Sequence, residues 1–189
     1  MPKRRVVRHE VVQPLDQSYR LIPLTQGQNA IVDIEDYDWL SEWNWFAKFD
    51  KQLQAFYAAR NGPRGGVSRY IPMHRVILSC TNGEECDHKN HNTLDNRRKN
   101  LRKCSHSENS KNQKTRKNNA YGFKGISFRK DSGRWRSWIC FNGKKINLGH
   151  FDNAVKAARA YDKAAKVYFR EFAHLNFPSL KNQGYIGQP

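Results

Sequence analysis

The sequence predicts an α+β protein made of two modules, and three patterns indicate it. Residues 18 to about 78 hold short aromatic and β-branched runs separated by turn residues, which is typical of strands. A polar, basic stretch follows at residues 80–117. Beyond residue 118, three alternating runs precede one amphipathic run, which predicts a three-stranded antiparallel sheet packed on a single helix.

The charge of the chain indicates a polyanionic partner. Its 189 residues fit one domain or two small ones, and 34 Lys+Arg against 17 Asp+Glu give a formal net charge of +17. Such an excess favours phosphate contacts with release of counterions. A basic protein that is merely soluble is the alternative, but the charge is clustered: residues 97–117 carry nine Lys/Arg and one acid, Glu108.

Composition also predicts the compartment. No apolar run approaches the roughly 20 residues of a membrane span, and the basic start at residues 1–5 lacks the apolar segment of a signal peptide. We expect a cytoplasmic protein of a bacterial or phage-infected cell, with no membrane partner. The cysteines fit reduced thiols. A zinc site of Cys80, Cys86 and Cys104 with His106 stays an alternative, although its spacing fits no standard ligand pattern.

The first module is expected to be rich in β-structure. A short helix, Met73–Leu78, is expected to follow Pro72. Three tryptophans in this region could stack on bases, but core positions are the favoured interpretation. They are Trp39, Trp43 and Trp45. The expected strands are Tyr19–Leu24, Ala30–Asp33, Trp43–Phe49 and Gln54–Ala59.

The residues that carry chemistry lie in the stretch 86–102. Phosphodiester hydrolysis needs an activated water, a cation and stabilisation of the leaving oxygen. Asp87 offers a hard oxygen ligand for Mg²⁺, and His88 can accept a proton near neutral pH. Neighbours on a strand point to opposite faces, so both can serve one site only if the strand end twists or turns.

A helix is predicted just downstream of this stretch. Ser105 and Glu108 have the spacing of a capping box, which would open a helix at Ser105. Asn109 then lies in the first turn and could face Asp87 as a second oxygen ligand.

Three blocks in this order resemble the HNH nucleases, in particular those of phages and mobile introns. The blocks are Asp87-His88, the run L-D-N-R-R-K-N-L-R at 94–102, and Ser107-Glu108-Asn109. The third signature position is Asn, as in the Asn-ended subgroup.

The resemblance implies a ββα-metal core at about 74–117 with a divalent metal, Mg²⁺ or Mn²⁺. Asp87 and Asn109 would hold the metal, His88 would be the general base, and Asn100 would bond His88 to fix its ring. His74 matches a family segment as well, and a structural role is favoured for it over a phosphate contact. Candidate phosphate clamps are Arg97, Arg98 and Arg102.

The second module shows clear strand and turn signals. Asn142-Gly143, between two alternating runs, is a strong hairpin signal. Asn153 is expected to cap a helix that runs to about Arg170. The expected strands are Lys124–Arg129, Arg134–Phe141 and Lys144–Leu148.

The stretch 121–178 resembles the plant Apetala/ethylene-response-factor DNA-binding domain through motifs such as Gly133-Arg134-Trp135 and Leu175-Asn176-Phe177-Pro178. The resemblance implies a sheet that enters the major groove and a helix that braces its back, with Tyr161 reaching a phosphate. Ser127 and Asn147 stand where plant proteins carry Arg or Trp, so the plant target sequence is not transferred. The implied DNA contacts are Lys124, Ser127, Arg129, Arg134, Arg136, Trp138, Lys145 and Asn147.

Together these features predict a homing-type HNH endonuclease that nicks double-stranded DNA, as a monomer or homodimer. The expected domains are a basic flexible arm at 1–17, a nuclease domain at 18–117, a DNA-binding domain at 118–178 and a tail at 179–189. Two alternatives stay open. One is a non-enzymatic DNA-binding regulator with a decayed nuclease core, and the other is a protein that acts on RNA.

Overall fold

The computed structural model describes residues 8–63, 65, 69–113, 115 and 119–178. It divides into two compact units, Met1–His106 (unit 1) and Ser107–Pro189 (unit 2). Each unit combines small antiparallel sheets with helices, so the expectation of a mixed α and β protein is confirmed at that level. The tail at 179–189 lies outside the described residues.

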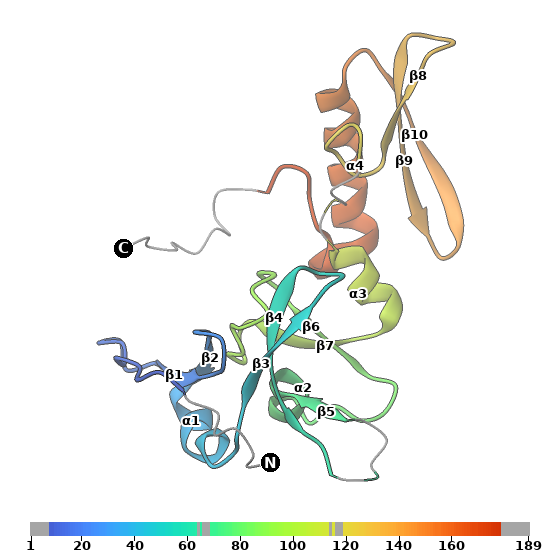
Figure 1. Cartoon of the computed structure of the whole chain (residues 1–189). Helices are drawn as coiled ribbons and strands as arrows, with labels where there is room; N and C mark the ends of the chain where they lie inside the picture. Colours follow the sequence, from blue (N-terminus) through green and yellow to red (C-terminus); the bar gives the residue numbers. More distant parts are fainter. Residues whose placement is uncertain (1–7, 64, 66–68, 114, 116–118, 179–189) are drawn as a thin grey trace. The chain divides into compact units, whose positions relative to one another are not determined.

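Unit 1 contains three small antiparallel sheets and two short helices (Figure 1). Two of the sheets are hairpins, β1–β2 and β6–β7, and the third has the order β3-β4-β5. The elements are β1 (Tyr19–Pro23), β2 (Asn29–Asp33), α1 (Ile34–Ser41), β3 (Phe46–Asp50), β4 (Ala55–Asn61), β5 (Tyr70–Pro72), α2 (Met73–Ile77), β6 (Glu85–His88) and β7 (Leu101–Cys104).

The core of unit 1 forms around Trp45, which is 1% exposed and donates its indole N–H to the Leu40 carbonyl at 2.7 Å. Trp39 packs against the same core. The prediction of core tryptophans is therefore confirmed for these two. It is wrong for Trp43, which is 47% exposed and lies under the Arg60 guanidinium, 3.9 Å from the ring centroid.

Two elements of unit 1 were not expected from the sequence. Helix α1 follows Asp33 and carries Glu35 and Asp36 in its first turn, where acids favour the positive end of the helix dipole. Strand β5 is too short for its alternation to stand out.

The described part of the expected arm, residues 8–17, makes hydrogen bonds to unit 1, and its flexibility stays a prediction. Arg8 donates to the Trp45 carbonyl, and Gln13 exchanges hydrogen bonds with the Leu21 backbone.

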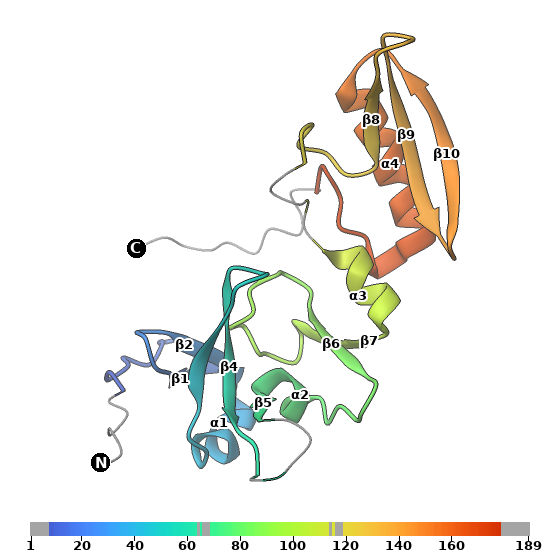
Figure 2. The same cartoon turned by 45° about the vertical axis from the view of Figure 1, so that its right-hand side comes forward.

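Unit 2 contains a three-stranded antiparallel sheet, in the order β10-β9-β8, with helix α4 packed on one face (Figure 2). This matches the predicted arrangement. The Asn153 side chain accepts from the Lys156 N–H at 2.8 Å, which confirms the predicted cap of α4. The elements are α3 (His106–Asn112), β8 (Ile126–Arg129), β9 (Arg134–Phe141), β10 (Lys144–Phe151), α4 (Ala154–Phe169) and the 3₁₀ turn η1 (Arg170–Phe172). Helix α3 starts at the last residue of unit 1 and continues in unit 2.

Alternation along β9 separates the two faces of this sheet as predicted. Ser137 and Ile139 are buried at 0% and 1%, and Trp135 packs against α4 residues. Arg134 and Trp138 alternate with them on the opposite face.

Lys124, an expected DNA contact, makes hydrogen bonds within unit 2, and its DNA contact stays a prediction. Its ammonium donates to the carbonyls of Lys111 and Gln113, at 3.2 and 2.8 Å, at the C-terminal end of α3. Burial lowers the pKa of Lys124 to about 8. This contact joins the end of α3 to Lys124 within unit 2, and the domain boundary at 117/118 stays a prediction.

Tyr161 also differs from expectation, because it is buried at 6% exposure and its ring packs on Gly125 instead of reaching outward. Gly125 has φ +71°, and its carbonyl accepts from the Trp138 N–H at 2.8 Å. Among the described residues, no helix has the length and apolar character needed to span a membrane.

We predict that Gly125→Ala destabilises unit 2 by at least about 2 kcal/mol. The new methyl group would collide with the Tyr161 ring and lie 2.7 Å from the Trp138 carbonyl, and the positive φ adds about 1–2 kcal/mol. Gly133→Ala is the matched control, because Gly133 has φ +65° but open space around it. Chemical denaturation of both variants measures the difference; equal losses would contradict the packing argument.

Candidate active site

The candidate catalytic pair lies at the end of strand β6. Asp87 and His88 are 7% and 5% exposed, and across the hairpin they are in register with Arg102 and Leu101. The charge of the neighbouring Asp87 carboxylate favours a higher pKa of His88. The antiparallel pairing with β7 thus fixes both residues on a short, buried hairpin.

The loop between β6 and β7 is closed by asparagine side chains. Asn100 is 5% exposed; it accepts from the Asn90 N–H at 3.0 Å and donates to the Asp95 carbonyl at 2.7 Å. Strand β2 also holds the loop through two backbone hydrogen bonds of Ile31. The Ile31 N–H donates to the Leu94 carbonyl at 2.8 Å, and the Ile31 carbonyl accepts from the Asn96 N–H at 2.7 Å.

The expected hydrogen bond from Asn100 to His88 is not formed. The Asn100 amide is used in closing the loop, and Asn96 is the residue that faces the His88 ring, with its Oδ1 3.4 Å from His88 Nε2. Asn96 is 1% exposed and also donates to the Leu94 carbonyl at 3.2 Å, so its side chain helps to hold the loop.

Two aromatic neighbours complete the surroundings of His88. His74, on α2, lies edge-on with ring centroids 5.0 Å apart, and Tyr57, on β4, lies 6.1 Å away. Burial lowers the pKa of His88, opposed by the Asn96 contact and the Asp87 charge, so the ring is kept neutral around neutral pH. A neutral imidazole can accept a proton.

The Asp87 carboxylate is paired with Arg102, whose Nε and Nη2 both donate to Oδ2, at 2.9 and 2.5 Å. The two side chains are 8% and 9% exposed. The Arg102 guanidinium thus balances the charge of this carboxylate within the hairpin, and a carboxylate oxygen is a ligand that a divalent metal accepts.

The three arginines expected as phosphate clamps are all engaged inside unit 1. Besides Arg102, Arg97 makes a two-pronged contact with Asp95, and Arg98 makes one with Asp36. The Arg–Asp distances are 2.7 to 2.8 Å. These guanidinium groups tie the loop and helix α1 together, which is a structural use that the charge run did not reveal.

The chemistry of the donors fits a divalent cation. Asp87 offers a carboxylate oxygen and Asn109 an amide oxygen, and Mg²⁺ is usually held by one or two protein ligands together with waters and phosphate. Asn109 lies on α3, in the part of that helix that belongs to unit 2. Within the described part of the chain, no group of three His, Cys, Asp or Glu is placed to hold a metal.

Two residues of the alternative zinc site contact protein groups outside that ligand set. Cys86 Sγ lies 3.9 Å from the His74 carbonyl, and His106 Nδ1 lies 2.7 Å from a Glu85 oxygen.

The outer face of the unit 2 sheet gathers most of the expected DNA-contact residues. Arg136 has a buried Nε without a hydrogen-bond partner. Lys145 Nζ lies 3.9 Å above the Trp138 ring, and these residues lie near Asn147. Ser127 pairs with Arg136 across the strands, whereas Arg129 pairs with Asp131, and Arg134 with Asp152 at 3.4 Å.

Comparisons with known proteins match this geometry. The HNH endonuclease family profile matches residues 73–111, which include Asp87, His88, Asn100 and Asn109. A stretch of 98 residues, 52% of the chain, is 40% identical to Protein 3.8 of Escherichia phage T7 and covers 76% of that protein. The chain belongs to the HNH endonuclease family.

This HNH endonuclease family member also matches plant proteins over 55 residues. It is 46% identical to "AP2-like ethylene-responsive transcription factor TOE2" of Arabidopsis thaliana and to "APETALA2-like protein 2" of Oryza sativa subsp. indica. The match covers 29% of this chain but only 11% and 13% of those proteins. The composite of an HNH part and an AP2-type part is therefore shown. No solved structure matches the chain significantly.

Sequence reasoning missed Tyr57 and the partners of the arginines. Tyr57 lies on a strand far along the chain from His88, and an alternating strand pattern does not reveal which ring faces a distant histidine. The Asp36 carboxylate is separated from its partner Arg98 in the same way, whereas Asp95 lies only two residues from Arg97.

We predict that Asn100→Ala destabilises unit 1 by about 2 kcal/mol. The change leaves the Asn90 N–H and the Asp95 carbonyl without their partner in a buried loop, and an unsatisfied buried group costs about 1–3 kcal/mol. Asn82→Ala, at an exposed position, is the control and is expected to be neutral. Urea denaturation measures both; a loss shared equally by the control would contradict the loop role.

Proposed function

We propose that the chain is a metal-dependent DNA endonuclease of the homing type that nicks double-stranded DNA. The observation that carries the proposal is the buried Asp87–His88 pair on β6, inside the stretch that matches the HNH endonuclease family. A buried carboxylate beside a buried, neutral histidine is costly to maintain, and such groups cluster at functional sites.

His88 is the general base of this proposal. With the Nε2 proton directed to Asn96 Oδ1, Nδ1 carries the lone pair that accepts a proton from water. Tyr57 and His74 confine the ring, so its orientation is held before substrate arrives. Asn100 keeps the loop closed and so acts on His88 through the backbone.

Asp87 and Asn109 are proposed to hold Mg²⁺ or Mn²⁺. The cation would supply charge stabilisation for the phosphate and the leaving oxygen. Arg102 pairs with the Asp87 carboxylate and fixes its position across the hairpin.

The sheet of unit 2 is proposed to read DNA. One of the plant relatives that it resembles is named a transcription factor, and its outer face carries Arg136, Trp138 and Lys145 on neighbouring strands. A buried Arg136 Nε without a partner fits a group that completes its hydrogen bonds on a ligand. A sheet in a major groove suits B-DNA better than A-form RNA, whose major groove is deep and narrow.

A regulator with a decayed nuclease core is the second candidate. The four signature residues argue against it, since Asp87, His88, Asn100 and Asn109 are all present in the matched stretch.

We predict that the wild-type protein converts supercoiled plasmid to the open circle in Mg²⁺ or Mn²⁺ and that His88→Ala slows this at least about 100-fold with DNA affinity retained. Loss of a general base typically costs about 10²–10⁴ in rate. His9→Ala, an exposed histidine of the same unit, is the matched control and is expected to cut normally. Binding without cutting by the wild type, in both metals, would favour the regulator.

We predict that Arg136→Ala weakens binding to duplex DNA about tenfold or more and reduces the salt dependence of affinity. Loss of a specific arginine contact costs about 1–3 kcal/mol. Arg159→Ala, on helix α4 behind the sheet, is the control and is expected to bind as the wild type does. Fluorescence anisotropy at two salt concentrations measures both. If the two variants bind equally, the sheet face is not the reading surface.

A further inference from the structure

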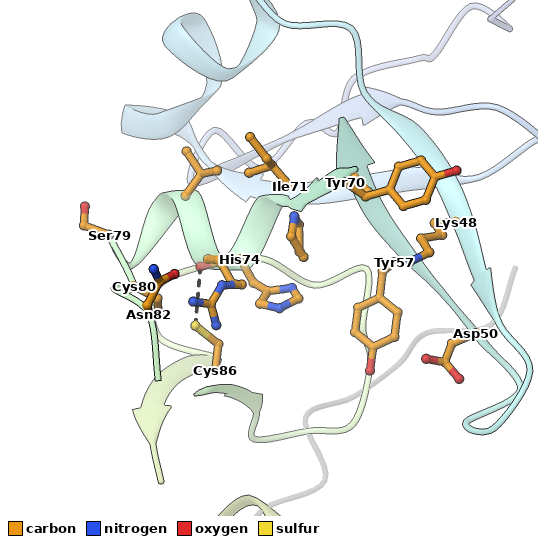
Figure 3. Close-up of a pocket in the computed structure, with 14 residues that line it drawn as sticks. Lys48, Asp50, Tyr57, Tyr70, Ile71, His74, Ser79, Cys80, Asn82 and Cys86 are labelled. Carbon is orange, nitrogen blue, oxygen red and sulfur yellow. Dashed lines mark hydrogen bonds between the residues drawn. The ribbon is translucent and has the colours of Figure 1, made fainter. Parts of the chain in front are cut away.

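A cavity in unit 1 adjoins the proposed base. Its volume is about 770 Å³, and its lining comes from strands β3, β4 and β5, from helix α2 and from the segment after it (Figure 3). Tyr57 and His74 line it, and both are ring neighbours of His88. A group bound in the cavity would therefore lie one side chain away from His88.

The inner wall of the cavity is neutral and holds an unpaired polar atom. His74 is 9% exposed, and its Nδ1 has no hydrogen-bond partner. Burial lowers its pKa to about 3, so the imidazole is neutral; burial also raises the pKa of Tyr57 to about 12, so the phenol keeps its proton. Buried polar atoms are rarely left without a partner, and this one belongs to a ring that lines the cavity, which favours a group that binds there.

The outer part of the lining is aromatic and cationic. Lys48 is exposed, and its Nζ lies 4.6 Å above the Tyr70 ring. Arg69, beside the lining, lies over the same ring at 5.2 Å. Among the described residues of the lining, Asp50 is the one acid. Aromatic rings suit a nucleobase, neutral donors and acceptors suit its edge, and a cation at the entrance suits a phosphate.

We propose that this cavity binds one nucleotide of the DNA strand, unstacked from the duplex, beside the phosphodiester that is attacked by the water His88 deprotonates. The inference rests on the proposed nuclease function and adds a substrate subsite to it. The volume lies in the range of about 300–1,000 Å³ that holds small ligands. A base pair within its stack cannot enter such a space, so the nucleotide has to leave the helix, as in enzymes that flip bases.

The test is calorimetric titration of the full-length protein, without divalent metal, with two probes. One is thymidine 3′,5′-bisphosphate, and the other is the 2-deoxyribose bisphosphate that lacks the base. The wild type is expected to bind the nucleotide about tenfold more tightly, as expected for one stacked base. Tyr57→Leu is expected to bring the two affinities together. Tyr121→Leu, in unit 2 and 41% exposed, is the matched control and keeps the difference.

Two results would overturn the subsite: equal wild-type affinity for the two probes, or a difference that persists in folded Tyr57→Leu. The wild-type comparison needs no variant, so it decides the question even where a substitution at Tyr57 harms folding. Plasmid cleavage by the same preparation separates the two proposals. A protein that cuts but does not distinguish the probes loses only the subsite, whereas one that distinguishes them but never cuts loses the nuclease.

Discussion

A buried carboxylate must be balanced by a positive charge, and the architecture of unit 1 follows from that requirement at Asp87. Removing such a charge from water costs several kcal/mol when it is left unpaired. The antiparallel register of β6 and β7 sets Arg102 opposite Asp87, and the guanidinium supplies the balance. A divalent cation at Asp87 would introduce a second positive charge next to Arg102, so metal affinity and this ion pair are coupled.

The same principle organises the rest of the loop. Asp95 and Asp36 are almost fully buried, and each is paired with an arginine from the loop after β6. Part of the basic run that indicated DNA binding therefore stabilises the fold, because Arg97 and Arg98 pair with acids of the protein itself. In unit 2, Lys124 also makes contacts within the protein, because its ammonium donates to a carbonyl at the end of α3, the helix that carries Asn109. Contacts within unit 2 therefore position α3.

Much of this fold could be predicted from the sequence, because the strongest signals were local. The Asn142-Gly143 turn, the Asn153 cap and the alternation on β9 each depend on residues close in the chain, and each is confirmed. The site was only partly predictable. The Asp87-His88 motif indicated the pair, but packing decides which side chains face the His88 ring. Asn96 takes the place expected for Asn100, and Tyr57 comes from a distant strand. Pairing of Arg98 with the buried Asp36 depends on the same long-range packing, whereas Arg97 pairs with its near neighbour Asp95.

The central claim is that Asp87 holds a catalytic metal ion. Electron paramagnetic resonance of Mn²⁺ titrated into the full-length protein measures it directly, because bound ion loses the signal of free Mn²⁺. The account predicts one site in the wild type and in His88→Ala, and loss of that site in Asp87→Asn, which keeps the shape of the side chain but removes its charge. Undiminished Mn²⁺ binding by a folded Asp87→Asn protein would contradict it.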